Sequence, residues 1–278
     1  MTFQIKALEE DLGVQLLDRT GTHVALTAAG RALLKRANQA RAALGEAEQE
    51  IAALSGDVAG ELAVGVSTTI SQYVLPLILG AFAKEYPRCR FHIVTGNTER
   101  IVNAIEEQRV ALGLIEGPPR SRAIGSAAFM DDDLVLIVPA AHEWGDVESI
   151  PCAELAHAPL LMRERGSGTR HVIEMALDKC GLKGKTLRVA MEIDSTEAIK
   201  SAVEAGLGVG FVSRWALRKD SRLGRQFKVV PVAGLEIRRR FLLASPAGPE
   251  PGGLAREFRR YLLARAPAGQ DAKPARRA

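Results

Sequence analysis

Hydrophobic and polar positions follow two different patterns along this chain, and one pattern gives way to the other near residue 60. Residues 3–12 place apolar side chains at roughly helical spacing, and Gly13 follows as a helix stop. Residues 14–27 hold two short apolar stretches around the sequence Arg-Thr-Gly-Thr, a pattern typical of a hairpin. The first part of the chain is therefore predicted to be a helix followed by a small hairpin.

A long helix is predicted next, with Thr27 as its N-cap and its end near residue 54. Its apolar residues recur at alternating intervals of four and three, the period of a coiled-coil seam: Leu33, Ala37, Ala40, Leu44, Ala47, Ile51 and Leu54. Because the stripe is narrow and its flanks are charged, pairing with a second copy is favoured over a helix that lies on its own domain. Residues 27–57 are thus interpreted as a linker and dimerisation helix.

From residue 61 onward, short apolar runs alternate with segments of helical spacing. The predicted strands are residues 61–67, 89–96, 111–117, 133–139, 158–163, 187–193, 208–213 and 239–245. This alternation predicts an α/β fold with two mostly parallel, doubly wound sheets. The acidic residues 131–133, just before one of these strands, are interpreted as a solvated turn.

The expected domain organisation has two α/β lobes. Residues 61–137 with 239–265 form predicted lobe one, residues 138–238 form predicted lobe two, and residues 266–278 form a disordered tail. In such folds ligands bind beyond the carboxyl ends of the strands, where helix N-termini gather.

Polar residues mark four places where a predicted strand gives way to a helix, at residues 67–71, 95–99, 166–170 and 194–198. Singly, each is better explained as a helix cap. Together, four helix ends around one cleft would offer N–H groups, hydroxyls and positive dipole ends to a small anion. The predicted binding residues are Ser67, Thr68, Thr69, Thr95, Asn97, Thr98, Glu116, Arg165, Ser167, Thr169, Arg170, Ser195 and Thr196. Arg165 or Arg170 would add charge, and a surface ion pair is the alternative for each.

Composition narrows the class of protein. A chain of 278 residues with 47% hydrophobic and 25% charged residues fits a globular protein of about two domains. The net charge of +4 is small, and much of it lies in residues 238–240 and at the C-terminus. Three dispersed cysteines and scattered histidines match no disulfide, metal or nucleophile pattern, so we expect no enzyme, no metal and no cofactor. Without an apolar signal region or membrane span, a reducing cytoplasm fits best.

Five stretches of the sequence resemble the LysR-type transcriptional regulators, and together they reach over nearly the whole chain: residues 4–34, 73–87, 111–117, 163–170 and 195–213. The first of these stretches, residues 4–34, is highly specific for the family. The segment from Arg165 onward, with residues 97–99, is most similar to the branch that regulates sulfur assimilation and carbon fixation. The resemblance implies a winged helix-turn-helix, a dimerising linker helix and a two-lobed effector domain like periplasmic binding proteins. It implies a ligand-responsive regulator with a small anionic effector, a homodimer or homotetramer and DNA as partners, and no membrane. The DNA contacts are expected at Gln4, Lys6, Arg19 and Thr22.

One departure from the family concerns the N-terminus. The chain opens inside the expected recognition helix, so residues 1–26 would form only a partial winged helix-turn-helix. Residues 1–57 carry six basic and eight acidic residues, which is not the positive footprint that phosphate binding needs. We favour a start codon that was assigned too late over a true truncation, because the wing and the linker helix retain their expected sequence patterns.

Other functions stay open as alternatives. The first is a cytoplasmic protein that binds a small anion without binding DNA. An exported solute-binding protein would need an export signal and would not carry the coiled-coil seam. A transferase or hydrolase would need a general base or a metal in the cleft, and the sequence offers neither.

Overall fold

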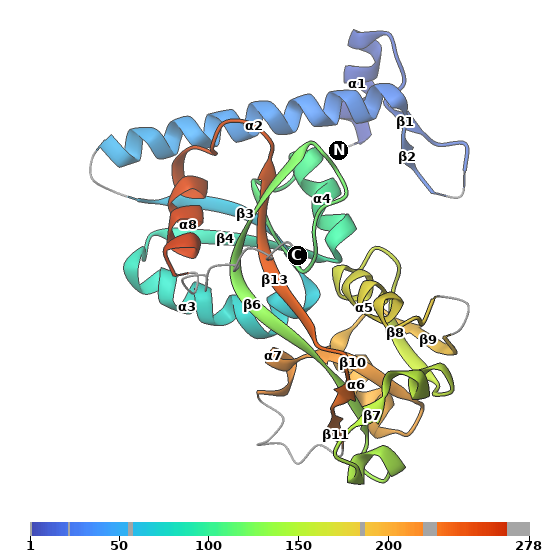
Figure 1. Cartoon of the computed structure of the whole chain (residues 1–278). Coiled ribbons are helices and arrows are strands. Elements are labelled where there is room, and N and C mark those ends of the chain that lie inside the picture. Colours follow the sequence, from blue (N-terminus) through green and yellow to red (C-terminus); the bar gives the residue numbers. More distant parts are fainter. Residues whose placement is uncertain (1, 22, 55–57, 184–186, 219–226, 266–278) are drawn as a thin grey trace, which may run out of the picture.

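The computed structural model describes residues 2–21, 23–54, 58–183, 187–218 and 227–265 (Figure 1). The predicted tail at residues 266–278, part of the predicted linker and the candidate Thr22 lie outside the described residues. Within the described ranges no helix combines the length and the hydropathy needed to cross a membrane.

The N-terminal part consists of a helix, a hairpin and a second, long helix. These elements are α1 (Thr2–Leu12), β1 (Leu17–Asp18), β2 (Ala25–Leu26) and α2 (Ala28–Leu54). Gly13 ends α1 with φ +66°, a left-handed conformation that favours glycine. The Thr27 side chain caps α2 by accepting a hydrogen bond from the Gly30 N–H at 3.0 Å. The predicted helix, hairpin and N-cap are all confirmed.

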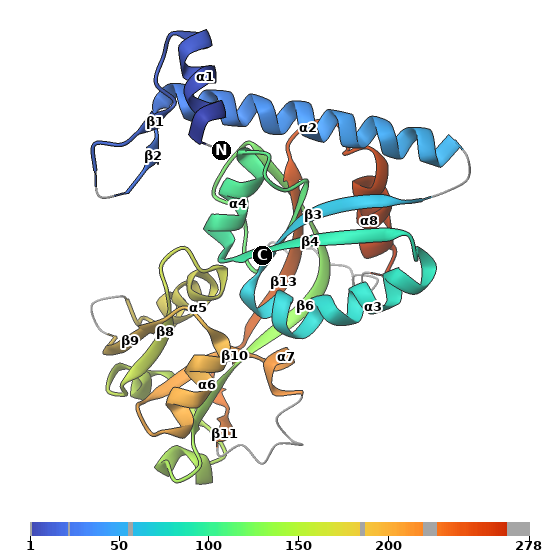
Figure 2. The same cartoon turned by 180° about the vertical axis from the view of Figure 1, so that it is seen from behind.

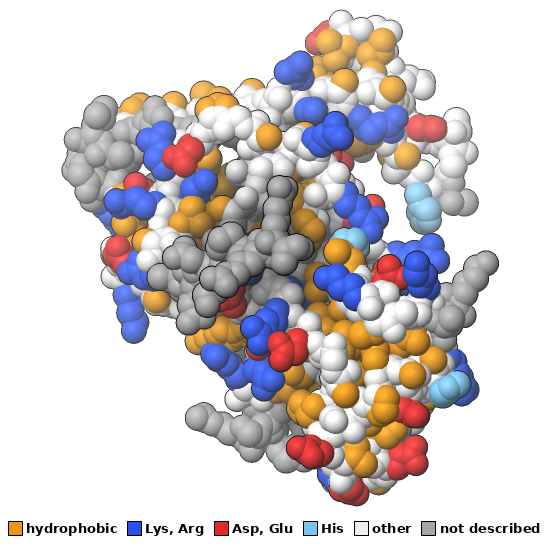
Figure 3. Space-filling model, viewed as in Figure 1, with side chains coloured by type: hydrophobic (Ala, Val, Ile, Leu, Met, Phe, Trp, Pro, Cys, Tyr) orange, Lys and Arg blue, Asp and Glu red, His pale blue; other side chains and the backbone are white. Residues whose placement is uncertain are grey.

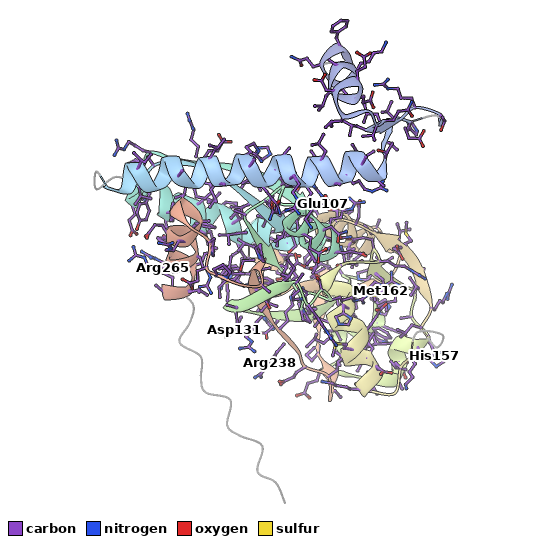
Figure 4. The ribbon with its side chains drawn as sticks, turned by 90° about the horizontal axis from the view of Figure 1, so that it is seen from above. Glu107, Asp131, His157, Met162, Arg238 and Arg265 are labelled. Carbon is purple, nitrogen blue, oxygen red and sulfur yellow. The ribbon has the colours of Figure 1, made fainter. Side chains whose placement is uncertain are left out.

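Helix α2 lies along one side of the globular body (Figures 1 and 2). Asn38 Nδ2 donates to the Glu107 carbonyl at 3.1 Å, and Figure 4 labels Glu107 beside the helix. Along the predicted seam, Leu33 is half-buried, Leu44 is 69% exposed and Ile51 is 67% exposed. The seam alanines at positions 37, 40 and 47 are exposed as well. Pairing of α2 with a second copy stays a prediction.

Lobe one is a parallel three-stranded sheet with helices on both faces. Its elements are β3 (Gly60–Ser67), β4 (Cys89–Gly96), β5 (Leu112–Ile115), α3 (Leu75–Glu85), α4 (Thr98–Glu106) and α8 (Gly253–Ala264). One hydrophobic core, which includes Phe82 and Phe258, joins the sheet to α3 and α8. A second core, which includes Ile101 and Ile105, joins it to α4.

Lobe two repeats this plan around three further parallel strands. Its main elements are β8 (Leu160–Arg163), β9 (Val189–Ile193), β10 (Val209–Ser213), α5 (Gly168–Lys179) and α6 (Thr196–Glu204). Its cores lie on the two faces of the sheet, one containing Ile173 and Leu177 of α5 and the other Ile199 and Val203 of α6. The smaller elements are β7 (Ile150–Pro151), α7 (Arg214–Leu217), β11 (Phe227–Val230), β12 (Val232–Ala233) and two short 3-10 turns, Glu143–Asp146 and Cys152–Ala156.

Two long antiparallel strands, β6 (Ile124–Pro139) and β13 (Ile237–Pro246), run from one lobe into the other (Figure 1). They pair with β5 in lobe one and with β10 in lobe two, so the two predicted sheets form one hydrogen-bonded sheet of nine strands. The predicted strands at residues 133–139 and 239–245 are segments of these longer strands. The predicted divisions between the lobes, after residue 137 and after residue 238, fall inside β6 and β13. This division into lobes stays a prediction.

The interpretation of residues 131–133 as a solvated turn is wrong. These residues lie inside β6, opposite residues 238–240 of β13. The aspartates at 131, 132 and 133 face the arginines at 240, 239 and 238 in register. Asp132 is buried, because the antiparallel partner strand supplies a cation for its carboxylate. Figure 4 labels Asp131 and Arg238, which belong to these two strands.

Candidate functional site

Three of the four predicted helix starts carry a polar side chain that caps its own helix. Asn97 Oδ1 accepts from the Arg100 N–H at 3.0 Å and caps α4. Ser167 caps α5 and Ser195 caps α6 in the same way, each with a 3.4 Å bond to the N–H three residues later. The capping alternative therefore holds for these three side chains, and their role as ligands stays a prediction.

The threonines of the two lobes meet at the junction. Thr69, which follows β3 in lobe one, and Thr196, the first residue of α6 in lobe two, are both buried, with their Oγ1 atoms 3.4 Å apart. Thr68 Oγ1 accepts from Arg163 Nη2 at 3.3 Å, also across the junction. Hydroxyl groups far apart in the sequence thus converge on one point between the lobes.

Arg163 is the cation at this point, and it was not among the predicted binding residues. It is the last residue of β8 and is only 2% exposed. Besides Thr68, its guanidinium donates to Thr196 Oγ1 at 3.5 Å and to the Asp194 carbonyl at 3.2 Å. Its ion pair is with the neighbouring Glu164, at 2.9 Å from Nε. The signal available in the sequence was its place directly after the apolar run of residues 160–162 in a predicted strand.

The two predicted arginines lie elsewhere. Arg170 pairs with Glu174 at 2.7 Å and with Glu192 at 2.5 Å, which is the surface-pair alternative. Arg165 is exposed, and its backbone N–H donates to Glu192 at 3.3 Å. Hydrogen bonds from Arg170 and Arg165 lower the pKa of Glu192 below its usual range. Arg170 Nη1 also donates to the Arg163 carbonyl at 3.0 Å. No hydrogen bond among the described residues joins either guanidinium to the threonines at the junction, and the role of both arginines as ligands stays a prediction.

A carboxylate completes the junction. Glu116, which follows β5, is 2% exposed and accepts from the Thr69 N–H at 2.8 Å and from Thr169 Oγ1. Burial by itself would raise the pKa of Glu116. Arg239, Arg163 and these hydrogen bonds outweigh burial and hold the pKa below its usual value. Glu116 is therefore an acceptor-only anion that ties both lobes together.

Behind Glu116 lies the pair formed by Arg239 and Asp132. Arg239 Nε lies 2.6 Å from Asp132 Oδ2, and its Nη1 donates to Thr169 Oγ1 at 2.8 Å and to Glu116 at 3.2 Å. Ser213 donates to the other carboxylate oxygen of Asp132 at 2.6 Å. Burial raises the pKa of Asp132 although Arg239 opposes the shift. Two buried carboxylates share this arginine, which fixes where β6 and β13 cross the junction.

The glycine-rich turn at residues 164–168 is a contact between the lobes. The Glu99 N–H donates to the Gly166 carbonyl at 3.2 Å, and Asn97 Nδ2 donates to the Arg165 carbonyl at 3.3 Å. A Cβ on Gly168 would lie 2.5 Å from Thr98 Oγ1 and 2.8 Å from the Gly117 nitrogen. Gly166 has φ +85°, where glycine is favoured. Glycine at these positions lets the lobes close on each other.

The remaining predicted residues are placed as follows. Ser67 is buried and donates to the Leu114 carbonyl at 3.2 Å, and Thr98 Oγ1 is buried with no hydrogen-bond partner among the described residues. Thr95 is exposed on β4. No three His, Cys, Asp or Glu side chains in the described ranges gather as a metal site requires.

The expected DNA contacts lie in the N-terminal part. Gln4 and Lys6 are exposed on α1, and Arg19 is exposed beside β1 with its Nη2 3.8 Å from Glu9 Oε2. Glu9 also accepts the N–H groups of Leu16 and Leu17 at 2.7 and 3.0 Å, which ties the hairpin to α1. Among the described hydrophobic residues before α2, Leu16 is the buried one.

Two protein-family models match the chain. The LysR substrate binding domain matches residues 55–267, and the bacterial regulatory helix-turn-helix protein, lysR family, matches residues 1–31. Among curated relatives, the RuBisCO operon transcriptional regulator of Allochromatium vinosum is 31% identical over 266 residues, which cover 96% of this chain and 86% of that protein. The regulator CysL of Bacillus subtilis is 31% identical over 240 residues, covering 86% of this chain and 79% of CysL.

The chain is also similar to solved structures. The regulatory domain of Synechocystis CcmR in complex with 2-PG is 28% identical, with a TM-score of 0.68 over 74% of this chain and 97% of that one. CbnR, a LysR family transcriptional regulator, is 22% identical with a TM-score of 0.70 over 96% of this chain and 89% of CbnR, a likeness that concerns the fold alone.

Proposed function

Since this chain belongs to the family of LysR-type transcriptional regulators, we propose that it senses a small oxyanion at the junction of its two lobes. The proposal rests on the position of Arg163. Its guanidinium is 2% exposed and donates to the hydroxyls of Thr68 and Thr196, which belong to opposite lobes.

The charge of Arg163 supports an anionic ligand. A buried guanidinium is costly unless anions compensate it. Arg163 has a two-bond pair with Glu164, which is 19% exposed, and it lowers the pKa of the buried Glu116. Its other acceptors are hydroxyl and carbonyl oxygens, which are neutral. An oxyanion that replaces these neutral acceptors forms hydrogen bonds in which donor and acceptor are both charged, and such bonds are among the strong ones.

The position of Arg163 connects binding to shape. An anion held by Arg163 and Thr196 of lobe two and by Thr68 and Thr69 of lobe one contacts both lobes at once. Such a ligand binds the closed arrangement better than an open one and shifts the population toward it. In this proposal β6 and β13 transmit the closure of the lobes toward α2, which is the proposed dimerisation helix. The regulator is cytoplasmic and contacts DNA through Gln4, Lys6 and Arg19 of its N-terminal part.

The ligand of CcmR gives a concrete probe. 2-PG combines a phosphate and a carboxylate, and CcmR is 28% identical to this chain. Calorimetry of 2-PG, inorganic phosphate and sulfate with the full chain tests the proposal. Replacing Arg163 by Met should weaken binding by about tenfold or more, since a hydrogen bond to a charged group is worth roughly 1.5–3 kcal/mol.

The matched control is Arg109→Met, which removes the same charge from a surface pair with Glu107 in lobe one. Arg109→Met should bind the anion as the unmodified chain does. Thermal melts establish that both variants are folded, and Arg163→Lys preserves the charge if the Met variant unfolds. Equal affinities for the Met variants of Arg163 and Arg109 would show that Arg163 is not the anion contact.

A further inference from the structure

A cavity lies beside α5, away from the threonines at the junction. It has a volume of about 470 Å³ and is bordered by α5, by β13 with the loop before it, and by the Gly117–Pro118 turn of lobe one. Thr68, Thr69, Arg163 and Thr196 do not line it. The anion site proposed above includes Thr196, the first residue of α6, whereas this cavity follows the side of α5 from Val172 to Cys180.

The walls of this cavity are largely apolar. Val172, Met175 and Ala176 contribute from α5, and Ile237 and Leu242 from β13. Met175 is 50% exposed although it is a large hydrophobic side chain. A volume of this size with apolar walls is in the range of small-molecule sites.

The border of the cavity is basic. Lys179, Arg238 and Arg240 line it, together with the buried Arg239. Arg238 pairs with Glu236 at 2.8 Å, but Lys179 and Arg240 form no ion pair with any described residue. On the face drawn in Figure 3, basic side chains border hydrophobic ones between β13 and α5. Glu116 and Glu236 also line the cavity, so its net positive charge comes from Lys179 and Arg240.

Arg239 provides an independent observation. Its side chain is 2% exposed and its Nη1 and Nε atoms are bonded to Glu116, Thr169 and Asp132, yet its Nη2 has no hydrogen-bond partner among the described residues. An unpartnered buried N–H group is costly. Arg239 is among the residues that line this cavity, so a ligand acceptor bound there would lie beside its guanidinium.

We propose that the cavity between α5, β13 and the Gly117–Pro118 turn is a second ligand site, which takes a small organic anion with an apolar body. A bare inorganic anion gains nothing from the walls, and a neutral apolar molecule gains nothing from Lys179 and Arg240. The site contacts lobe one, lobe two and a strand that crosses between them.

Fluorescence titration of the full chain tests this proposal with two matched probes. Anilinonaphthalene sulfonate is an aromatic anion, and phenylnaphthylamine is its neutral counterpart. The double variant Lys179→Gln/Arg240→Gln should weaken binding of the sulfonate by about tenfold, equivalent to roughly 1.4 kcal/mol. Binding of the neutral probe should be weaker in the unmodified chain and unchanged in the variant. Met175→Glu, which places a negative charge on the wall, should abolish binding of the sulfonate.

The control Lys84→Gln/Arg90→Gln removes the same two charges from exposed positions in lobe one and should leave the titration unchanged. Arg163→Met should also leave it unchanged, which separates this site from the junction. Circular dichroism establishes that each variant is folded, since this fluorophore also binds loosened cores. Equal sulfonate binding by the two double variants, or its loss in Arg163→Met, would overturn the proposal.

Discussion

Thr69 and Thr196 hold their Oγ1 atoms 3.4 Å apart, one from each lobe, although 127 residues separate them in the chain. If an oxyanion binds between them, each hydroxyl contributes to its affinity. Thr69→Val and Thr196→Val preserve the shape and remove the hydroxyl, so each should cost about 1–3 kcal/mol of binding free energy. Calorimetry with 2-PG measures this. Thr20→Val, in the hairpin, is the control, and an effect at one lobe only would mean that the anion does not bridge the lobes.

Gly168→Ala should loosen the contact between the lobes. The new Cβ would lie 2.5 Å from Thr98 Oγ1 and within 2.9 Å of the backbone of Glu116 and Gly117, which cannot move aside easily. We expect a loss of about 1–3 kcal/mol in the free energy of unfolding, as for other overpacked positions, and a larger radius of gyration in X-ray scattering. Gly80→Ala on α3, where nothing lies within 4 Å, should be neutral or slightly stabilising. An unchanged radius with Gly168→Ala would exclude closure through this turn.

Replacing two neighbouring arginines on β13 should lower the free energy of unfolding by very different amounts. Arg239→Met leaves Asp132 and Glu116 buried without their shared cation and should lower the free energy of unfolding by about 3–5 kcal/mol. Arg238→Met removes an exposed pair with Glu236, and such pairs contribute roughly 0–1 kcal/mol. Urea denaturation of both variants makes the comparison. Similar losses would contradict the assignment of Arg239 as the structural cation.

The stability of the fold should depend on pH through Glu116. Its pKa in the folded chain is held below the ordinary value of 4.5, so the carboxylate stabilises the fold above that pH. This contribution is lost as the pH falls below 4.5 and through the folded pKa. Glu116→Gln lacks it, so the difference in unfolding free energy between the two chains should be largest near neutral pH and shrink in acid. A difference that is constant from neutral pH to strong acid would contradict a lowered pKa.

The exposed side of α2 should hold two copies together. Leu44 and Ile51 are 69% and 67% exposed, and burying each against a partner contributes on the order of 1.5–3 kcal/mol. Leu44→Asp/Ile51→Asp should therefore halve the mass measured by light scattering. Val147→Asp, at an exposed valine of lobe two, is the control. An unchanged mass in the double variant would place the contact between copies elsewhere.

The local elements of this protein follow from short-range patterns in its sequence. The hairpin, the start of α2 at Thr27 and the caps of α4, α5 and α6 depend on residues a few positions apart, and such signals are present in the sequence. The strands of the two lobes followed from runs of apolar residues between turns. The gathering of helix starts between the lobes followed from the order of strands and helices, which fixes the edge of the sheet where they meet.

Which charged residues occupy the interior depends on contacts between distant parts of the chain. Residues 131–133 have the local pattern of a polar turn because their partners at 238–240 lie more than 100 residues later, and pairing register over that distance has no local signal. The sequence pattern favours Arg165 and Arg170 over Arg163, although all three lie in one short segment. What distinguishes Arg163 is burial beneath the opposite lobe, and a side chain's burial depends on what the rest of the chain places over it.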